Sequence, residues 1–124
     1  MGLSGDHGGT YFLTKLVGSG IARELCFTGE AVDATRAAAL GIANRVFAQE
    51  KLMEDALAFC GQIAQGPTAI YGRMKDNLNA AWTATTREAL DTEAFNIALS
   101  RLGNDAAEAG RAVREKRPPR FTGT

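Results

Sequence analysis

The sequence begins with one carboxylate, Asp6, set among glycines. Gly5, Gly8 and Gly9 would let the backbone approach a ligand closely. The apolar segment 11–17 that follows is typical of a short helix, and the first N–H groups of a helix attract negative charge. An apolar pocket would suit this carboxyl to proton transfer or to nucleophilic attack. Composition alone favours a simpler interpretation, in which Asp6 is a turn or N-cap residue.

The glycine spacing excludes three familiar kinds of site. The opening loop lacks the Gly-Lys-Ser/Thr ending of a phosphate-binding loop. The segment 18–20 fails the dinucleotide-binding pattern, because Arg23 stands where the third glycine would be. The chain also has no Gly-x-Ser-x-Gly nucleophile turn. The opening loop is therefore the best candidate for chemistry.

Histidine and cysteine usage argues against a metal site. His7 is the sole histidine, and adjacent side chains of an extended loop point apart, so we expect no dyad with Asp6. Cys26 and Cys60 lie far apart in helical patterns, without the paired spacing of metal ligands. We expect both cysteines to be small buried apolar residues and not a disulfide.

Charge and hydropathy give no sign of a nucleic-acid or membrane partner. Lys and Arg number 14, as do Asp and Glu, so no net field attracts polyanions. No apolar run approaches the roughly 20 residues that span a bilayer. The start shows no secretory leader, so we expect a cytoplasmic protein. A chain of 124 residues with 45% hydrophobic residues fits one domain with a modest core.

Short elements are predicted to follow the opening loop. The pattern predicts helices over 11–17 and 19–26, interrupted by Gly18, and a third helix that begins at an N-capping Asp33. The segment 43–47 is typical of a short strand, the only convincing one in the chain.

Helical patterns continue almost to the C-terminus. We expect helices over 52–63, from Pro67 to about residue 81, and from about Thr86. The third of these has two apolar stripes: Leu90, Ala94 and Ile97 on one side, and Phe95, Leu99 and Leu102 on another. A helix that is apolar on two sides is buried on both, either inside a domain or between subunits.

The last predicted helix has Asn104 as its N-cap and ends before two prolines. Its inward residues are predicted to be Ala106, Ala109, Gly110 and Val113. A basic segment follows, with Arg111, Arg114, Lys116, Arg117 and Arg120. Such a segment is usually a solvated helix end, and its functional interpretation is a clamp on phosphates.

The order of these motifs resembles the crotonase (enoyl-CoA hydratase/isomerase) family. The resemblance covers nearly the whole chain, through segments 8–18, 22–30 and 34–46, the helix carrying Lys75, and the tail 114–121. It implies a lyase or isomerase of fatty acid metabolism that acts on acyl-CoA thioesters. Coenzyme A is then part of the substrate, so no separate cofactor and no metal are expected. An oxyanion hole of two backbone N–H groups would hold the enolate, and carboxylates would move protons.

The resemblance also predicts the fold. Family members have a spiral of βαβ units, followed by C-terminal helices that build trimers or hexamers. This chain corresponds to the later portion, so we expect a mainly α structure with about one short strand. Residues 1–48 would end the spiral core, and 49–124 would form the helical oligomerisation region. The oxyanion hole and the usual loop glutamate would fall before Met1, so we expect the chain alone to be inactive.

Three residues carry site roles by resemblance. Asp6 would be catalytic; hydratases often have glycine there, whereas dienoyl-CoA isomerases and a chlorobenzoyl-CoA dehalogenase have aspartate. Lys116 matches a tail lysine that approaches CoA phosphates, often across a subunit boundary. Phe95 would lie near the adenine or the acyl tunnel. Two alternatives stay open: a helical oligomerisation or interaction module without catalysis, and a variant such as a dienoyl-CoA isomerase or dehalogenase.

Overall fold

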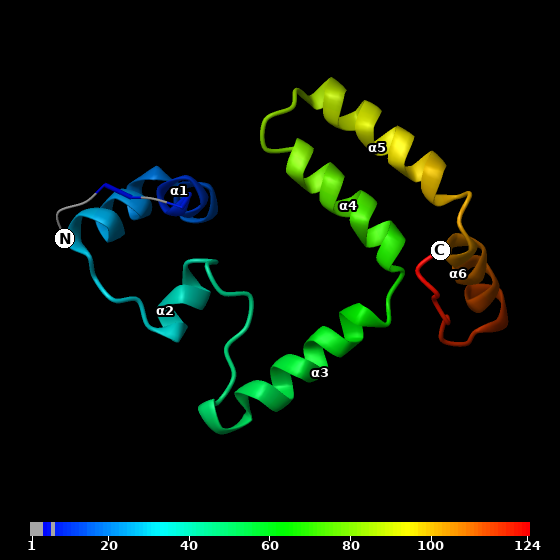
Figure 1. Cartoon of the computed structure of the whole chain (residues 1–124), viewed down its shortest axis with the longest axis horizontal. Helices are drawn as coiled ribbons and strands as arrows, with labels where there is room; N and C mark the ends of the chain where they lie inside the picture. The colour runs from blue at the N-terminus through cyan, green and yellow to red at the C-terminus, as the bar shows by residue number, and fades with distance from the viewer. Residues whose placement is uncertain (1–3, 6) are drawn as a thin grey trace. The chain divides into compact units, whose positions relative to one another are not determined.

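The structure, a computed structural model, describes residues 4–5 and 7–124 (Figure 1). Within those residues the regular structure is entirely helical, which confirms the mainly α fold class. The helices are α1 (Gly9–Thr28), α2 (Ala34–Ala39), the 3-10 helix η1 (Gln49–Lys51), α3 (Leu52–Ala64), α4 (Thr68–Ala80), α5 (Thr86–Ser100) and α6 (Asn104–Glu115). None of these helices is both long and apolar enough to cross a bilayer.

The chain divides into two compact units, Met1–Leu52 and Met53–Thr124. The predicted assignment of 1–48 to a spiral core and of 49–124 to oligomerisation stays a prediction.

The strand predicted over 43–47 is wrong. This segment has no regular structure, and no strand occurs among the described residues. An extended segment becomes a β-strand only by exchanging backbone hydrogen bonds with a neighbouring strand. The apolar residues of 43–47 therefore favour an extended backbone, but the described part of the chain supplies no strand beside them.

The predicted interruption at Gly18 is confirmed. The two helices expected over 11–17 and 19–26 are joined in α1 across a kink, where Gly18 has φ 79° and ψ 164°. That left-handed φ is accessible to glycine because it has no Cβ. After the kink, Ala22 and Leu25 are buried, whereas Phe27 is 81% exposed.

The predicted N-cap of α2 is also confirmed. The Asp33 carboxylate accepts a hydrogen bond of 2.7 Å from the Arg36 N–H, which satisfies one of the free donors of the first turn. The Arg36 guanidinium then pairs with Glu24 at 3.1 Å and with Glu30. These pairs join α2 to the end of α1 and the residues after it, and the hydrogen bond that Arg36 donates to Glu30 is the main cause that raises the pKa of Arg36.

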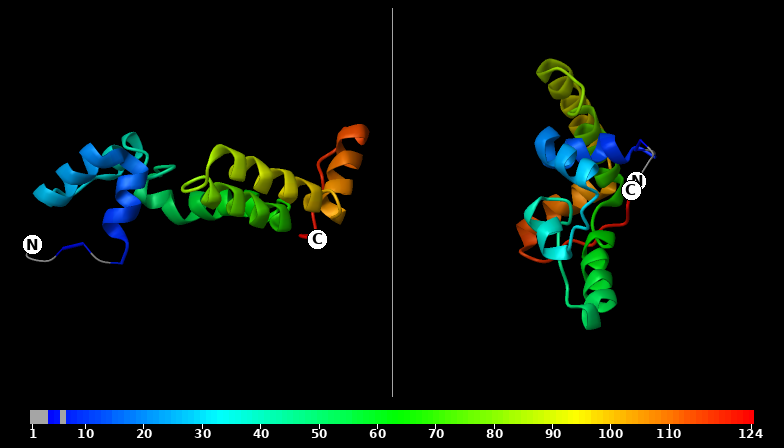
Figure 2. Two further views of the ribbon diagram at one scale, coloured as in Figure 1. Left: turned by 90° about the horizontal axis from the view of Figure 1, so that it is seen from above. Right: turned by 90° about the vertical axis from the view of Figure 1, so that its left-hand side faces the viewer.

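In the second unit, α4 and α5 form an antiparallel hairpin and lie side by side in every view (Figure 2). Thr85 and Glu88 make a capping box at the start of α5, with the Glu88 carboxylate accepting from the Thr85 N–H at 2.8 Å. That backbone hydrogen bond is the main cause that lowers the pKa of Glu88. Between the two helices, the buried Asn96 side chain donates to Asn77 Oδ1 at 2.6 Å. The amide pair fixes the register of the hairpin, since a slip would leave a buried amide unpaired.

Candidate functional site

Lys116 lies at the C-terminal end of α6 in an unusual conformation. Its φ of 52° and ψ of 42° are left-handed, and its N–H donates to Val113 O at 3.3 Å. A lysine has a steric cost in this region that glycine avoids, so the neighbouring structure must hold it there. The turn is closed by the backbone, since the Arg117 N–H also donates to Ala112 O at 3.1 Å. From Arg117 on, the C-terminal tail, residues 117–124, turns back along α6 (Figure 1).

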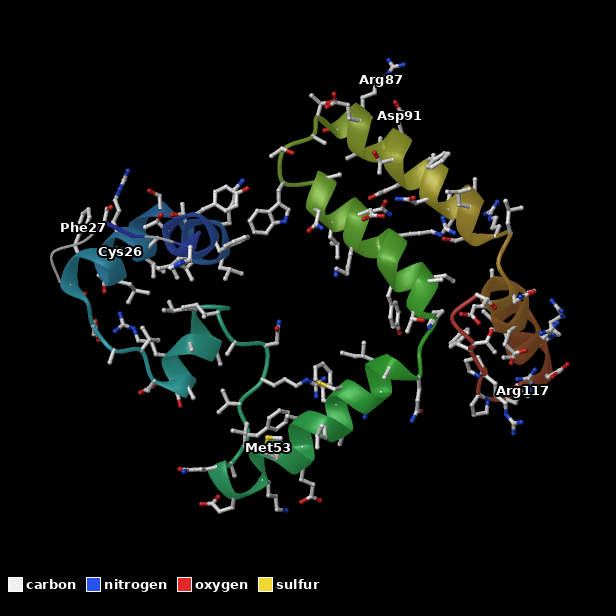
Figure 3. All side chains as sticks on the ribbon, viewed as in Figure 1. Cys26, Phe27, Met53, Arg87, Asp91 and Arg117 are labelled. Atoms are coloured by element: carbon white, nitrogen blue, oxygen red, sulfur yellow. The ribbon has the colours of Figure 1, made fainter. Side chains whose placement is uncertain are left out.

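Glu108 fixes the first half of the tail. Its side chain is 10% exposed, and the Arg117 guanidinium donates to both carboxylate oxygens, at 2.6 and 3.2 Å. The Arg120 N–H donates to the same carboxylate at 3.0 Å, and Arg111 approaches it at 3.1 Å. These hydrogen bonds, with that from Arg117 the largest cause and that from the Arg120 N–H the next, lower the pKa of Glu108 to about 2. Figure 3 labels Arg117 where the tail leaves α6.

Asp105 fixes the second half of the tail. Its side chain is among the most buried in the described chain, and its carboxylate accepts from the backbone N–H groups of Thr122 at 2.7 Å and of Gly123 at 2.9 Å. The Asp105 N–H donates in turn to Thr124 O at 2.9 Å. The tail therefore ends against the first turn of α6. We call the contacts of Glu108 and Asp105 with the tail the carboxylate latch.

The sequence prediction for α6 is wrong in two respects. The N-cap is Gly103, and the Asn104 side chain donates to Thr124 Oγ1 at 3.2 Å instead of capping the helix. Val113, predicted to face inward, is 79% exposed. The covered face carries carboxylates, because the returning tail presents backbone N–H groups that need acceptors. Hydropathy alone places such carboxylates outside.

A groove of 660 Å³ lies along the α4–α5 hairpin and the start of α6. Its apolar lining includes Ile70, Met74, Leu90 and Ile97. Both predicted stripes of α5 are exposed at Leu90, Ile97, Phe95 and Leu102. The expected burial of these stripes therefore does not occur within the described chain.

Phe95 and Lys116 are not brought together. Phe95 lies in the middle of α5, is 64% exposed, and is not among the residues that line the groove. In the described part of the chain, no hydrogen bond, ion pair or ring contact joins Phe95 to Lys116, which follows α6. Their predicted roles toward a CoA thioester stay predictions.

Asp6 lies outside the described residues, so its predicted catalytic role also stays a prediction. The glycine turn after it does begin a helix: Gly8 is the N-cap of α1, and the Phe12 N–H donates to Gly8 O at 2.9 Å. Gly8 has φ 80°, and a Cβ there would meet the Phe12 ring at 2.9 Å. Glycine is thus required both by the backbone and by the close approach of the ring.

The cysteines differ from expectation. Cys26 and Cys60 are free and exposed, so the prediction that both are buried is wrong. Cys60 belongs to α3, none of whose residues is buried in the described chain. Among the described residues, no three His, Cys, Asp or Glu side chains gather in a way that could hold a metal ion.

Sequence comparisons relate the whole chain to one family. The sequence model of the enoyl-CoA hydratase/isomerase family matches residues 1–124. The trans-2-decenoyl-[acyl-carrier-protein] isomerase of Streptococcus mutans is 33% identical over 99% of this chain and 47% of its own length. The mitochondrial enoyl-CoA hydratase of Pongo abelii is 32% identical over 92% of this chain and 39% of its own length.

Structural comparisons agree. An enoyl-CoA hydratase subunit of Geobacillus kaustophilus is 36% identical and superposes with a TM-score of 0.94, over 99% of this chain and 48% of that one. An enoyl-CoA hydratase of Polaromonas is 27% identical, with a TM-score of 0.92 over 98% of this chain and 47% of that one. The chain thus spans about half the length of the relatives it matches.

Proposed function

Because this chain belongs to the enoyl-CoA hydratase/isomerase family, we propose that it supplies the C-terminal part of a site for acyl-CoA thioesters. The observation that carries this proposal is the match of the family model to all 124 residues. The oxyanion hole and the loop glutamate of the proposed site come from the half of the relatives that this chain does not match. We refer to the chain joined to such a half as the complete protein.

Two residues of this chain have roles in the proposed reaction. Asp6 moves a proton beside the thioester, while the oxyanion hole stabilises the enolate as its charge develops. The Lys116 ammonium binds a CoA phosphate, because charge-assisted hydrogen bonds to phosphate are among the strongest available to a side chain. The exposure of Lys116 at the C-terminal end of α6 supports this role, since its ammonium is accessible to a ligand.

The 124-residue chain by itself is expected to leave crotonyl-CoA unchanged. Without an oxyanion hole the enolate charge has no preorganised hydrogen-bond donors, and such donors are usually the largest single source of transition-state stabilisation. The measurement is the absorbance of the conjugated thioester with the purified chain and with buffer alone. Turnover above the buffer rate would show that residues 1–124 hold a complete site.

The exposed apolar residues on and after α5 support a second function, self-association. Leu90, Phe95 and Ile97 are exposed on two sides of α5, and Leu102 is exposed in the turn that follows it, although contiguous exposed apolar surface is uncommon in monomers. We propose that α5 packs between copies of the chain, in a trimer or hexamer.

Light scattering tests this assembly. The wild-type chain is expected to have the mass of an oligomer, and Leu90→Asp is expected to lower that mass by placing a charge in the contact. Glu50→Gln changes a charge in η1, outside α5, and is the control that is expected to keep the wild-type mass. A wild-type chain that runs as a monomer at all concentrations would contradict the assembly.

A further inference from the structure

The carboxylate latch has a consequence for Lys116. We propose that Glu108 is a positioning residue, which holds Lys116 in place by fixing the C-terminal tail against α6. The inference rests on the proposed function for the identity of the ligand, a CoA phosphate, but not for the latch itself. Neither the hydropathy pattern nor the motifs of the sequence indicate a role for Glu108.

Glu108 contacts residues that follow Lys116 in the chain. Glu108 lies two helical turns before Lys116, and its partners Arg117 and Arg120 follow Lys116 in the sequence. The carboxylate therefore contacts the chain on both sides of the turn, from the helix before Lys116 and from the tail after it. With both sides fixed, the backbone of Lys116 has little freedom to leave its left-handed conformation.

The contacts of Glu108 with the tail are directional and involve the main chain. The Arg117 guanidinium binds the carboxylate with two nitrogens, a geometry that fixes direction as well as distance. The Arg120 N–H adds a backbone donor, so the tail is held by its main chain and not only by a mobile side chain. Glu115 also contacts Arg117, at 2.6 Å, but its side chain is 55% exposed and contacts no backbone group of the tail.

The far end of the tail is fixed as well. Asp105 accepts from two successive backbone N–H groups, at Thr122 and Gly123. A Cβ on Gly123 would lie 2.6 Å from Thr68 Oγ1, so the tip of the tail reaches the start of α4. The tail is thus fixed at both ends, and loosening the Glu108 end frees the segment that adjoins Lys116.

Amide exchange tests the latch without any ligand. In the 124-residue chain, Glu108→Gln is expected to speed hydrogen exchange at the Arg120 amide at least tenfold, because the charged acceptor is lost. Glu115→Gln removes the same charge beside the same arginine and is expected to change that exchange less than twofold. Arg117→Gln removes the other partner of this ion pair and is expected to speed exchange at the Arg120 amide as well, which keeps the test available if Glu108→Gln does not fold. Equal exchange in Glu108→Gln, Arg117→Gln and wild type would overturn the inference.

The pH dependence of exchange adds an independent readout. The charged groups around Glu108 are Arg111 on α6 and Arg117 and Arg120 of the tail, with Glu115 beyond Arg117 and Asp105 one turn earlier on α6. Because the pKa of Glu108 is lowered to about 2 in the folded chain, the Glu108 contacts of the latch are complete above the ordinary carboxyl pKa and are lost as pH falls toward 2. Exchange at Arg120, corrected for its intrinsic pH dependence, is expected to rise over that window in wild type and to stay flat in Glu108→Gln. A wild-type profile as flat as that of the variant would overturn the latch.

Coenzyme A affinity of the complete protein tests the effect on Lys116. Glu108→Gln is expected to weaken CoA binding at least fivefold in calorimetry, and less than twofold when Lys116→Gln is already present. This non-additivity separates positioning from general damage, which would add in both backgrounds. An equal loss in both backgrounds would overturn the positioning role. If wild type binds no CoA while the exchange results hold, the proposed function fails and the latch is supported.

Discussion

Asp6→Asn is expected to lower kcat of the complete protein about a hundredfold or more on its acyl-CoA substrate. Asparagine keeps the size of the side chain but cannot accept or deliver a proton near neutral pH. General acid–base groups contribute about two to four orders of magnitude to the rate. The expected KM change is small, since the thioester and the CoA moiety keep their other contacts. Steady-state kinetics on crotonyl-CoA and on a dienoyl-CoA measure both constants.

The control for Asp6 is Asp33→Asn in the same assay. Asp33 caps α2 through the Arg36 N–H, and asparagine caps nearly as well, so kcat is expected to stay unchanged. A kcat for Asp6→Asn within about threefold of wild type would show that Asp6 is not the acid or base. The glycine turn before α1 would then serve structure alone.

Lys116→Gln is expected to raise KM for an acyl-CoA about tenfold in the complete protein, with little change in kcat. In the proposed site the ammonium binds a phosphate far from the reacting carbons, so its loss would weaken the binding of ground state and transition state alike. The same variant is expected to leave KM for an acyl-pantetheine unchanged, because that substrate lacks the CoA phosphates.

Lys51→Gln is the matched control for this second prediction. Lys51 lies in η1, and its replacement removes the same charge from the chain. Its KM for acyl-CoA is expected to equal that of wild type. A tenfold rise in both variants would point to net charge as the cause, and no rise in Lys116→Gln would remove Lys116 from the phosphate site.

The sequence predicts the fold best where one local interaction decides the structure. The kink at Gly18 follows from a backbone that glycine alone adopts readily, and the start of α2 follows from the short reach of the Asp33 carboxylate to the third residue after it. The strand over 43–47 is wrong for the opposite reason. A strand depends on a partner elsewhere, and the residues of the segment carry no information on whether one is present.

The sequence does not reveal the carboxylate latch, because a hydropathy pattern assigns charged residues to the solvent-exposed face of a helix. On α6 the buried residues are Asp105, Glu108 and Ala112, so two of the three are carboxylates, while the apolar Val113 is exposed. A signal was present in the spacing of the two carboxylates, one helical turn apart, ahead of two prolines that end the helix. A tail that must turn back offers unpaired backbone N–H groups, and carboxylates are good acceptors for them.

Burial on α5 was predicted from its two apolar stripes and does not occur within the described chain. An apolar stripe at helical spacing indicates that one face of a helix is buried in a contact, but it does not identify the surface that makes this contact. Phe95 illustrates the difference, because its exposed ring is compatible with a contact between copies as well as with a ligand.

A crystal structure of the complete protein with bound CoA tests whether this chain forms part of an acyl-CoA site. We expect Lys116 Nζ to lie at hydrogen-bond distance, about 3 Å, from a CoA phosphate oxygen, and the Asp6 carboxylate to face the thioester end of the ligand. A CoA molecule whose phosphates contact other residues in every subunit, with Lys116 pointing into solvent, would contradict it.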